Sequence, residues 1–88
     1  MLTAPPMKLV LVDWVDSHEA RGWRSMDKLL EIAHPLPCQS VGWLLSRADG
    51  CAVIVPHVAG DGVHLMRQGC GALTIPTCAI KKVRRLSC

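Results

Sequence analysis

Ser40-Val-Gly-Trp-Leu-Leu45, Ser46-Arg-Ala-Asp-Gly50 and Cys51-Ala-Val-Ile-Val-Pro56 follow one another without a break, and this stretch decides the fold. The first and third pieces are short apolar runs of the kind that favours strands. The Asp49-Gly50 pair between them predicts a hairpin, because glycine accepts the positive φ that a tight hairpin turn requires. The second half of the chain is therefore expected to fold as antiparallel β-strands.

Further strands are expected on both sides of this hairpin. Lys8–Val15 has apolar residues on both faces, which is typical of a central strand or of a strand at a subunit contact. Ala72–Pro76 predicts another strand, and Val63–Met66 is either a loop or a strand extension. The apolar spacing of the final residues favours a 3₁₀ turn at Thr77–Ala79, followed by a bulged strand that reaches Leu86.

One short helix is predicted after the first strand, over Met26–Ala33. Ser25 is a typical N-cap, and Asp27 suits the positive end of the helix dipole in the first turn. Pro35 and Pro37 end the helix, because proline cannot continue it and biases the preceding residue toward extended geometry. A helix of about two turns is not stable alone in water, so we expect it to pack on the sheet or to act as a lid.

These elements predict a mainly-β fold: a small SH3-like or Sm-like barrel of about five antiparallel strands, with one short helix after the first strand. The chain has 88 residues, enough for one domain. We expect residues 7–88 to form the barrel and residues 1–6 to be a disordered leader, so that Met7 could be the native start. No phenylalanine or tyrosine is present, so Trp14, Trp23 and Trp43 are expected to be the large pieces of the core.

The composition favours self-association and a reducing environment. Half of the residues are apolar, which in so small a chain indicates a homo-oligomer. Five cysteines form an odd set without a CxxC pair, so free and mostly buried thiols in the cytoplasm of a bacterial host are expected. The longest apolar run, about six residues, is far below the ~20 needed to cross a bilayer, so no membrane is expected as a partner.

The modest net charge of +3 gathers near the end of the chain, at Lys81, Lys82, Arg84 and Arg85. These residues have two interpretations. Lysine and arginine on a terminal edge strand discourage edge-to-edge aggregation. The same residues could instead face the phosphates of RNA or DNA. We favour edge protection, because no basic excess extends over the whole domain.

The densest polar cluster follows the first strand and is the candidate ligand-binding loop. Its residues offer carboxylates, an imidazole, guanidinium groups and an indole that could stack on a ring: Asp13, Asp16, His18, Arg21, Trp23 and Arg24. The alternative is a solvated connection in which Asp16 or Ser17 caps a turn and the tryptophans fill the core. The sequence is compatible with both a ligand-binding loop and a solvated connection.

Catalysis, metals and cofactors are not expected. Histidines and cysteines lack the paired short spacing of a zinc site. Cys38, close to His34 in the sequence, is the nearest approach to a nucleophile beside a base, but nothing in their spacing enforces a contact. The chain also has no phosphate-binding loop, nucleophile elbow or zinc-protease motif. We therefore expect a protein that is not an enzyme.

Several short motifs resemble a family of small, uncharacterised proteins of tailed bacteriophages and prophages. The matching residues are Asp13-Trp14-Val15-Asp16-Ser17-His18, Gly22-Trp23, Ser40-Val41-Gly42-Trp43-Leu44, Pro56-His57, and Thr74-Ile75-Pro76 with Ile80, Val83 and Leu86. This resemblance implies an accessory protein of the bacterial cytoplasm. The ending that starts at Ile75-Pro76 also resembles the closing of SH3-like and Sm-like barrels, which implies a ring or another oligomer.

The expected function is accordingly a non-catalytic phage or prophage accessory role. The protein is expected to act as an oligomeric small β-barrel that binds a host protein or a small ligand such as a nucleotide. The alternative is an Sm-like ring that binds RNA or DNA through the basic residues of its last strand.

Overall fold

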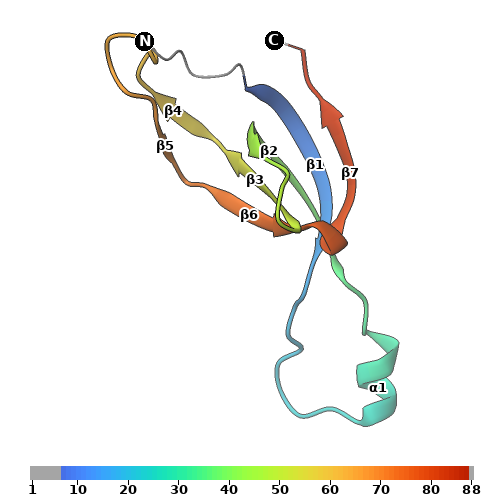
Figure 1. Ribbon diagram of the computed structural model, residues 1–88. Helices are drawn as coiled ribbons and strands as arrows, with labels where there is room; N and C mark the ends of the chain where they lie inside the picture. Colours follow the sequence, from blue (N-terminus) through green and yellow to red (C-terminus); the bar gives the residue numbers. More distant parts are fainter. Residues whose placement is uncertain (1–6, 88) are drawn as a thin grey trace.

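The computed structural model describes residues 7–87, which form a five-stranded antiparallel sheet, a small two-stranded sheet and a projecting arm that carries a short helix (Figure 1). In chain order the elements are β1 (Lys8–Asp16), α1 (Met26–Glu31), β2 (Leu36–Ser46), β3 (Cys51–Val55), β4 (His57–Ala59), β5 (Gln68–Cys70), β6 (Leu73–Pro76), the 3₁₀ turn η1 (Thr77–Ala79) and β7 (Ile80–Arg85). The expected mainly-β fold is therefore present.

The five strands lie in the order β6-β3-β2-β1-β7. β6 and β7 are the two edges of this sheet, and η1 joins them along the chain. The barrel that the sequence predicts is thus open, because these two edge strands do not pair with each other. The expectation that the basic strand Ile80–Arg85 is an edge strand is confirmed.

The hairpin between β2 and β3 forms as predicted. Asp49 and Gly50 both adopt positive φ, 58° and 76°, and the backbone N–H of Cys51 donates to the carbonyl of Ala48 at 3.2 Å. Two successive residues with positive φ make the turn whose twist matches that of the flanking strands. The carbonyl of Gly50 also accepts a hydrogen bond of 2.9 Å from the N–H of Thr77, which ties the hairpin to η1.

The core lies on one face of the sheet and is small. Val10 and Val12 of β1, Ile54 of β3 and Ile75 of β6 are each at most 2% exposed and form one cluster. Half-buried side chains surround this cluster: Trp14, Leu44, Leu73, Ala79, Ile80 and Val83. The indole N–H of Trp14 donates to the hydroxyl of Ser40 at 3.0 Å, so this ring is anchored on β2.

The opposite face of β1 is only partly covered. Leu9 and Leu11 are half-buried and pair across the sheet with Trp43 and Val41 of β2, and Val41 remains 52% exposed. The prediction that β1 is buried on both faces is thus met on the core face alone. Without a second layer over these residues, the sheet presents apolar side chains to its surroundings.

Several boundaries differ from the prediction. β2 begins at Leu36, where Pro37 pairs with Val15 of β1. Proline is tolerated at this point because β3 pairs with β2 only from Trp43 onward, so Pro37 needs to donate no hydrogen bond on its other side. The short strands β4 and β5 were not expected, and Val63–Met66 belongs to the loop between them.

The end of the chain follows the prediction closely. The strand expected at Ala72–Pro76 is present as β6, which starts one residue later, at Leu73. The 3₁₀ turn spans Thr77–Ala79 as predicted. The register between β7 and β1 shifts between Asp13 and Trp14, which is the expected bulge in the last strand.

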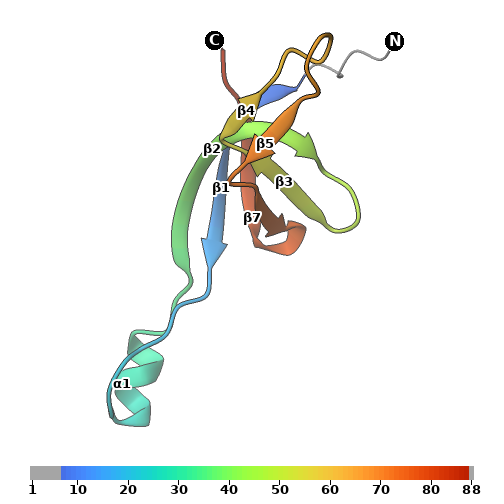
Figure 2. The same cartoon turned by 90° about the vertical axis from the view of Figure 1, so that its left-hand side faces the viewer.

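The helix starts where the sequence predicts but does not pack on the sheet. Ser25 is its N-cap, with the hydroxyl accepting the N–H of Lys28 at 3.2 Å. The helix lacks a buried side chain, and the arm that carries it extends the described part of the molecule to 62 Å, against 26 and 23 Å across (Figure 2). The expectations that the helix packs on the sheet and that Trp23, now fully exposed, fills the core are both wrong. No helix within residues 7–87 has the length and apolarity that a bilayer crossing needs.

We expect truncation of the core to destabilise the protein strongly. Ile54→Ala removes a fully buried side chain and should lower the free energy of unfolding by about 2–4 kcal/mol. Leu45→Ala, at a position that is 60% exposed, serves as the control and should cost about 0.5 kcal/mol or less. Urea unfolding followed by circular dichroism measures both; equal losses would contradict the assigned core.

Candidate functional site

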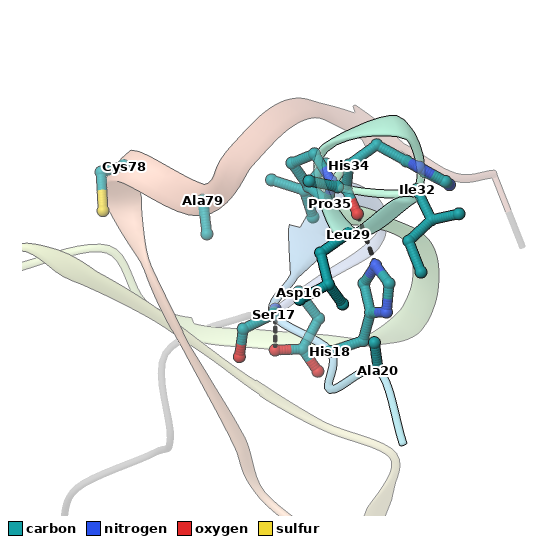
Figure 3. A pocket seen from close by; sticks show the side chains of 12 residues that line it. Asp16, Ser17, His18, Ala20, Leu29, Ile32, His34, Pro35, Cys78 and Ala79 are labelled. Carbon is teal, nitrogen blue, oxygen red and sulfur yellow. Dashed lines mark hydrogen bonds between the residues drawn. The ribbon is translucent and has the colours of Figure 1, made fainter. Parts of the chain in front are cut away.

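A hollow with a volume of about 630 Å³ lies at the base of the arm. It is formed by the loop after β1, by one side of α1 with the residues that follow it, and by η1 (Figure 3). The lining is mostly apolar with a polar edge: Val15, Asp16, Ser17, His18, Ala20, Leu29, Ile32, Ala33, His34, Pro35, Cys78 and Ala79. Its size is within the range of small-molecule sites, although it is open on one side.

The two histidines of this hollow hold the outgoing and returning chains of the arm together. The Nε2 atom of His18 lies at 2.5 Å from the carbonyl oxygen of His34, so His18 donates there when Nε2 carries the proton. The two rings meet edge to face, with centroids 5.7 Å apart. On the opposite wall, the carboxylate of Asp16 accepts the N–H of Ser17 at 2.8 Å. This arrangement suits an apolar or aromatic group with one hydrogen-bonding edge.

The six residues of the predicted ligand loop do not come together in one site. Asp16 and His18 line the hollow, whereas Arg21, Trp23 and Arg24 do not. The loop runs out along the arm, and these last three side chains are exposed on it. The sequence cluster is therefore divided because the chain extends away from the sheet instead of folding back over it.

Asp13, the remaining member, is occupied by a hydrogen-bonded network on the outer face of the sheet. Its carboxylate accepts the side-chain amide of Gln39 at 2.7 Å and the guanidinium of Arg84 at 3.0 Å, which links β2, β1 and β7. The hydrogen bond from Gln39, followed by that from Arg84 and the charges of Arg84 and Lys82, lowers the pKa of Asp13. Asp13 thus contributes to cross-strand pairing, which the sequence pattern alone did not reveal.

The basic residues of β7 are all exposed, but they are not equivalent. Arg84 is paired with Asp13, and the charge of Lys82 also acts on that carboxylate. Lys81 and Arg85 form no ion pair with any residue in 7–87. Part of the basic group considered for phosphate contacts is therefore already neutralised within the sheet.

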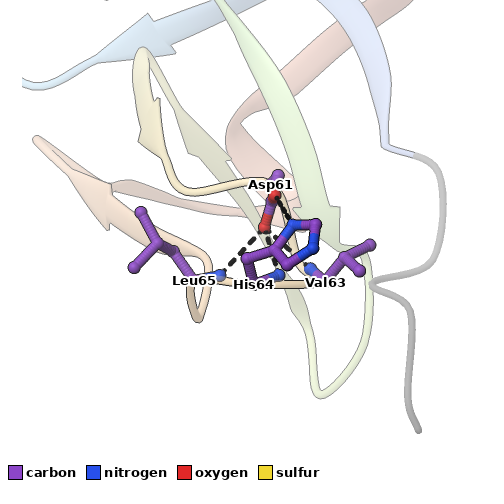
Figure 4. Close-up of polar contacts among 4 residues, drawn as sticks. All are labelled: Asp61, Val63, His64 and Leu65. Atoms are coloured by element: carbon purple, nitrogen blue, oxygen red, sulfur yellow. Dashed lines mark hydrogen bonds and ion pairs between the residues drawn. The ribbon is translucent and has the colours of Figure 1, made fainter.

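A second ordered polar feature, which the sequence analysis missed, lies in the loop between β4 and β5. One carboxylate oxygen of Asp61 accepts the backbone N–H groups of Val63, His64 and Leu65 at 2.7–2.9 Å, and the other lies 2.9 Å from Nδ1 of His64 (Figure 4). The N–H groups of Leu65 and Val63 are the main reason that the pKa of Asp61 falls far below its usual range. An aspartate between two glycines at the start of a loop is the signal that could have indicated it.

The four cysteines within residues 7–87 have free thiols that are less buried than expected, and Cys88 lies outside the described residues. Cys38 and Cys51 are half-buried, whereas Cys70 and Cys78 are exposed, so the expectation of mostly buried thiols is wrong for the latter pair. Cys38 donates to the carbonyl of Leu36 at 3.5 Å. Within the described range, histidine, cysteine and acidic side chains never gather in threes as metal ligands.

Comparison with known proteins returned no match: neither a family model, nor a curated protein, nor a solved structure corresponds to this chain.

The Asp61 carboxylate should control the order of its loop. Asp61→Ala removes the acceptor of three backbone N–H groups, so hydrogen exchange at Val63, His64 and Leu65 should become several-fold faster. Asp16→Ala is the control, because its carboxylate accepts only the N–H of Ser17. Since the folded pKa of Asp61 is depressed, its contribution is complete above the ordinary value of 3.8 and is lost as the pH falls below it. Unchanged exchange in Asp61→Ala would contradict this role.

Proposed function

We propose that this protein is a non-catalytic phage or prophage accessory protein that acts in the bacterial cytoplasm by binding other protein surfaces, its own copies first. The motif resemblance to tailed-phage proteins supports the biological setting. The arm supports the mode of action, because Trp23, Met26 and Leu30 are exposed on it and no other described residue covers them.

An SH3-like or Sm-like relationship is part of this proposal. The strand order β6-β3-β2-β1-β7, with a 3₁₀ turn between the two edge strands, is the order that such a barrel has when it is opened between its last two strands. The bulge that bends β7 on β1 favours the curvature that closure would need. Association through the arm would leave both sheet edges available for this closure.

The observation that carries the proposal is the exposure of one side of the arm. Trp23 is fully exposed, and Met26 and Leu30 of α1 are 77% and 75% exposed. Met26 and Leu30 are four residues apart and share one face of the helix, whereas Trp23 lies in the chain just before the N-cap Ser25. Since a six-residue helix has little stability of its own, this face is expected to be covered when the protein functions.

A second copy of the chain is the occupant that fits this face. When two arms meet antiparallel about a two-fold axis, Met26 lies against Leu30 of the second copy. Arg24 approaches Glu31 of that copy in competition with Lys28, which pairs with Glu31 at 3.5 Å within its own helix. The contact is self-complementary, because the same pairs form twice. Arg24 precedes the helix and Glu31 is its last residue, while Asp27 and Lys28 lie between them in the opposite charge order, so the antiparallel arrangement is favoured by the outer pair alone.

A nucleic-acid-binding ring receives less support. It would depend on Lys81, Lys82, Arg84 and Arg85, of which Arg84 is engaged by Asp13. The hollow at the base of the arm would accept a small ligand, but two of its walls belong to the arm, so its shape depends on how the arm is held.

Arm pairing predicts self-association that depends on Trp23 and Leu30. In sedimentation equilibrium the wild-type chain should exceed its monomer mass of 9.6 kDa, and Trp23→Ser with Leu30→Ser should restore the monomer. Leu65→Ser is the control, because that side chain is 68% exposed but lies on the loop between β4 and β5.

Charge-reversal variants in the same sedimentation experiment test the contact between Arg24 and Glu31. Arg24→Glu and Glu31→Arg should each weaken association, and the double reversal should recover it, since the pairs of the two-fold contact are exchanged together. A wild-type chain that stays monomeric over the whole concentration series, or a double reversal as weak as the single variants, would exclude arm pairing.

A further inference from the structure

Trp43 borders two hollows at the end of the sheet that lies opposite the arm. One has a volume of about 370 Å³ and is shared with Val58, Gly60 and Arg67 of the small sheet and its loop. The other, of about 360 Å³, is shared with the start of β1 and the end of β7, including Lys8 and Arg85. The ring therefore separates two spaces, each large enough to accept a planar group beside it.

Trp43 belongs to a strand of the sheet and not to a loop. Trp43 pairs with Leu9 of β1 on one side and with Val55 of β3 on the other, and Val55 is only 4% exposed. Trp43 itself is half-buried, so part of its ring remains accessible. Because this strand is paired on both sides, the backbone that carries the ring is already ordered before a ligand binds, which lowers the entropic cost of stacking.

All charged side chains that line the two hollows within residues 7–87 are basic. They are Lys8, Arg67 and Arg85, and none of them forms an ion pair with another described residue. The acidic residue that follows Gly60, Asp61, directs its carboxylate to the N–H groups of its own loop. The surroundings of Trp43 are therefore positively charged.

We propose that Trp43 is the stacking platform of a site for a nucleobase that carries phosphate, with Lys8, Arg67 and Arg85 as the phosphate contacts. An aromatic ring flanked by uncompensated cations meets the two chemical parts of such a ligand, a π-face and an anionic chain. The ligand is either a free nucleotide or one unit of a single strand. This site is separate from the arm and does not depend on arm pairing.

Fluorescence anisotropy with the full chain tests the proposal. The two labelled probes are a ten-nucleotide oligothymidylate and an abasic strand with the same number of phosphates. Adenosine monophosphate is the unlabelled competitor. The oligothymidylate should bind at low salt, and the abasic strand should bind at least about tenfold more weakly because it has no base to stack. Affinity should fall as the salt concentration rises, because phosphate contacts release counterions.

Variants separate the platform from general charge. Trp43→Leu should weaken binding about tenfold or more. Arg67→Gln and Arg85→Gln should each reduce the slope of log affinity against log salt by about 0.7, as expected for one phosphate contact on a single strand. Arg84→Gln, whose guanidinium is paired with Asp13, is the matched control and should leave binding unchanged. The two surface arginine variants keep the test valid if Trp43→Leu fails to fold.

The outcomes decide both the proposal and the source of the ligand. If adenosine monophosphate competes with the oligothymidylate, the proposal is supported and the ligand is a free nucleotide. If the oligothymidylate binds and adenosine monophosphate does not compete, the proposal is supported and the ligand is a single strand. The proposal is overturned if neither probe binds at low salt. It is equally overturned if the abasic strand binds as tightly as the oligothymidylate, or if the arginine variants bind like the wild type.

Discussion

The packing of Ile54 and Ile75 against Val10 and Val12 is the interaction on which the rest of the structure depends. This contact brings the core-facing side chains of β3 and β6 against those of β1, although these strands are far apart in the chain. The turn at Asp49–Gly50 orients β3 for this contact and, through the carbonyl of Gly50, also holds the start of η1. The bulge at Asp13 and Trp14 then lets β7 continue along β1.

Half of the residues are apolar, and a core of this size cannot bury all of them. The remaining apolar side chains are distributed over the surface. Trp23, Met26 and Leu30 lie on the arm, and Trp43 lies at the other end of the sheet. The two places differ in their charges. The arm carries a basic and an acidic residue that suit a second copy of itself, whereas the surroundings of Trp43 are basic and suit an anion. The small size of the core thus leaves two exposed apolar regions, for which we propose two different binding partners.

The two aspartates whose pKa values are lowered, Asp13 and Asp61, have a structural role. Asp13 links three strands through Gln39 and Arg84, and Asp61 holds the backbone of its own loop. The partners of Asp13 are far away in the chain, so its sequence neighbours do not suggest its role, whereas the Gly60-Asp61-Gly62 stretch is a local signal for the role of Asp61. Asp13 belongs to a polar cluster in the sequence that the structure disperses. Of the residues predicted to bind a ligand, Asp16 and His18 line the hollow at the base of the arm.

Local chemistry was enough to determine the hairpin at Asp49–Gly50, the N-cap at Ser25 and the 3₁₀ turn at Thr77–Ala79, because each depends on residues within a few positions of one another. Only the tertiary structure decided that the sheet stays open, that Trp23 is exposed while Trp14 packs on the core, and that Trp43 meets Arg67 and Arg85. These outcomes depend on where the arm leaves the sheet and on which strands become neighbours. Side chains far apart in the chain decide both, since they compete for the same small apolar core.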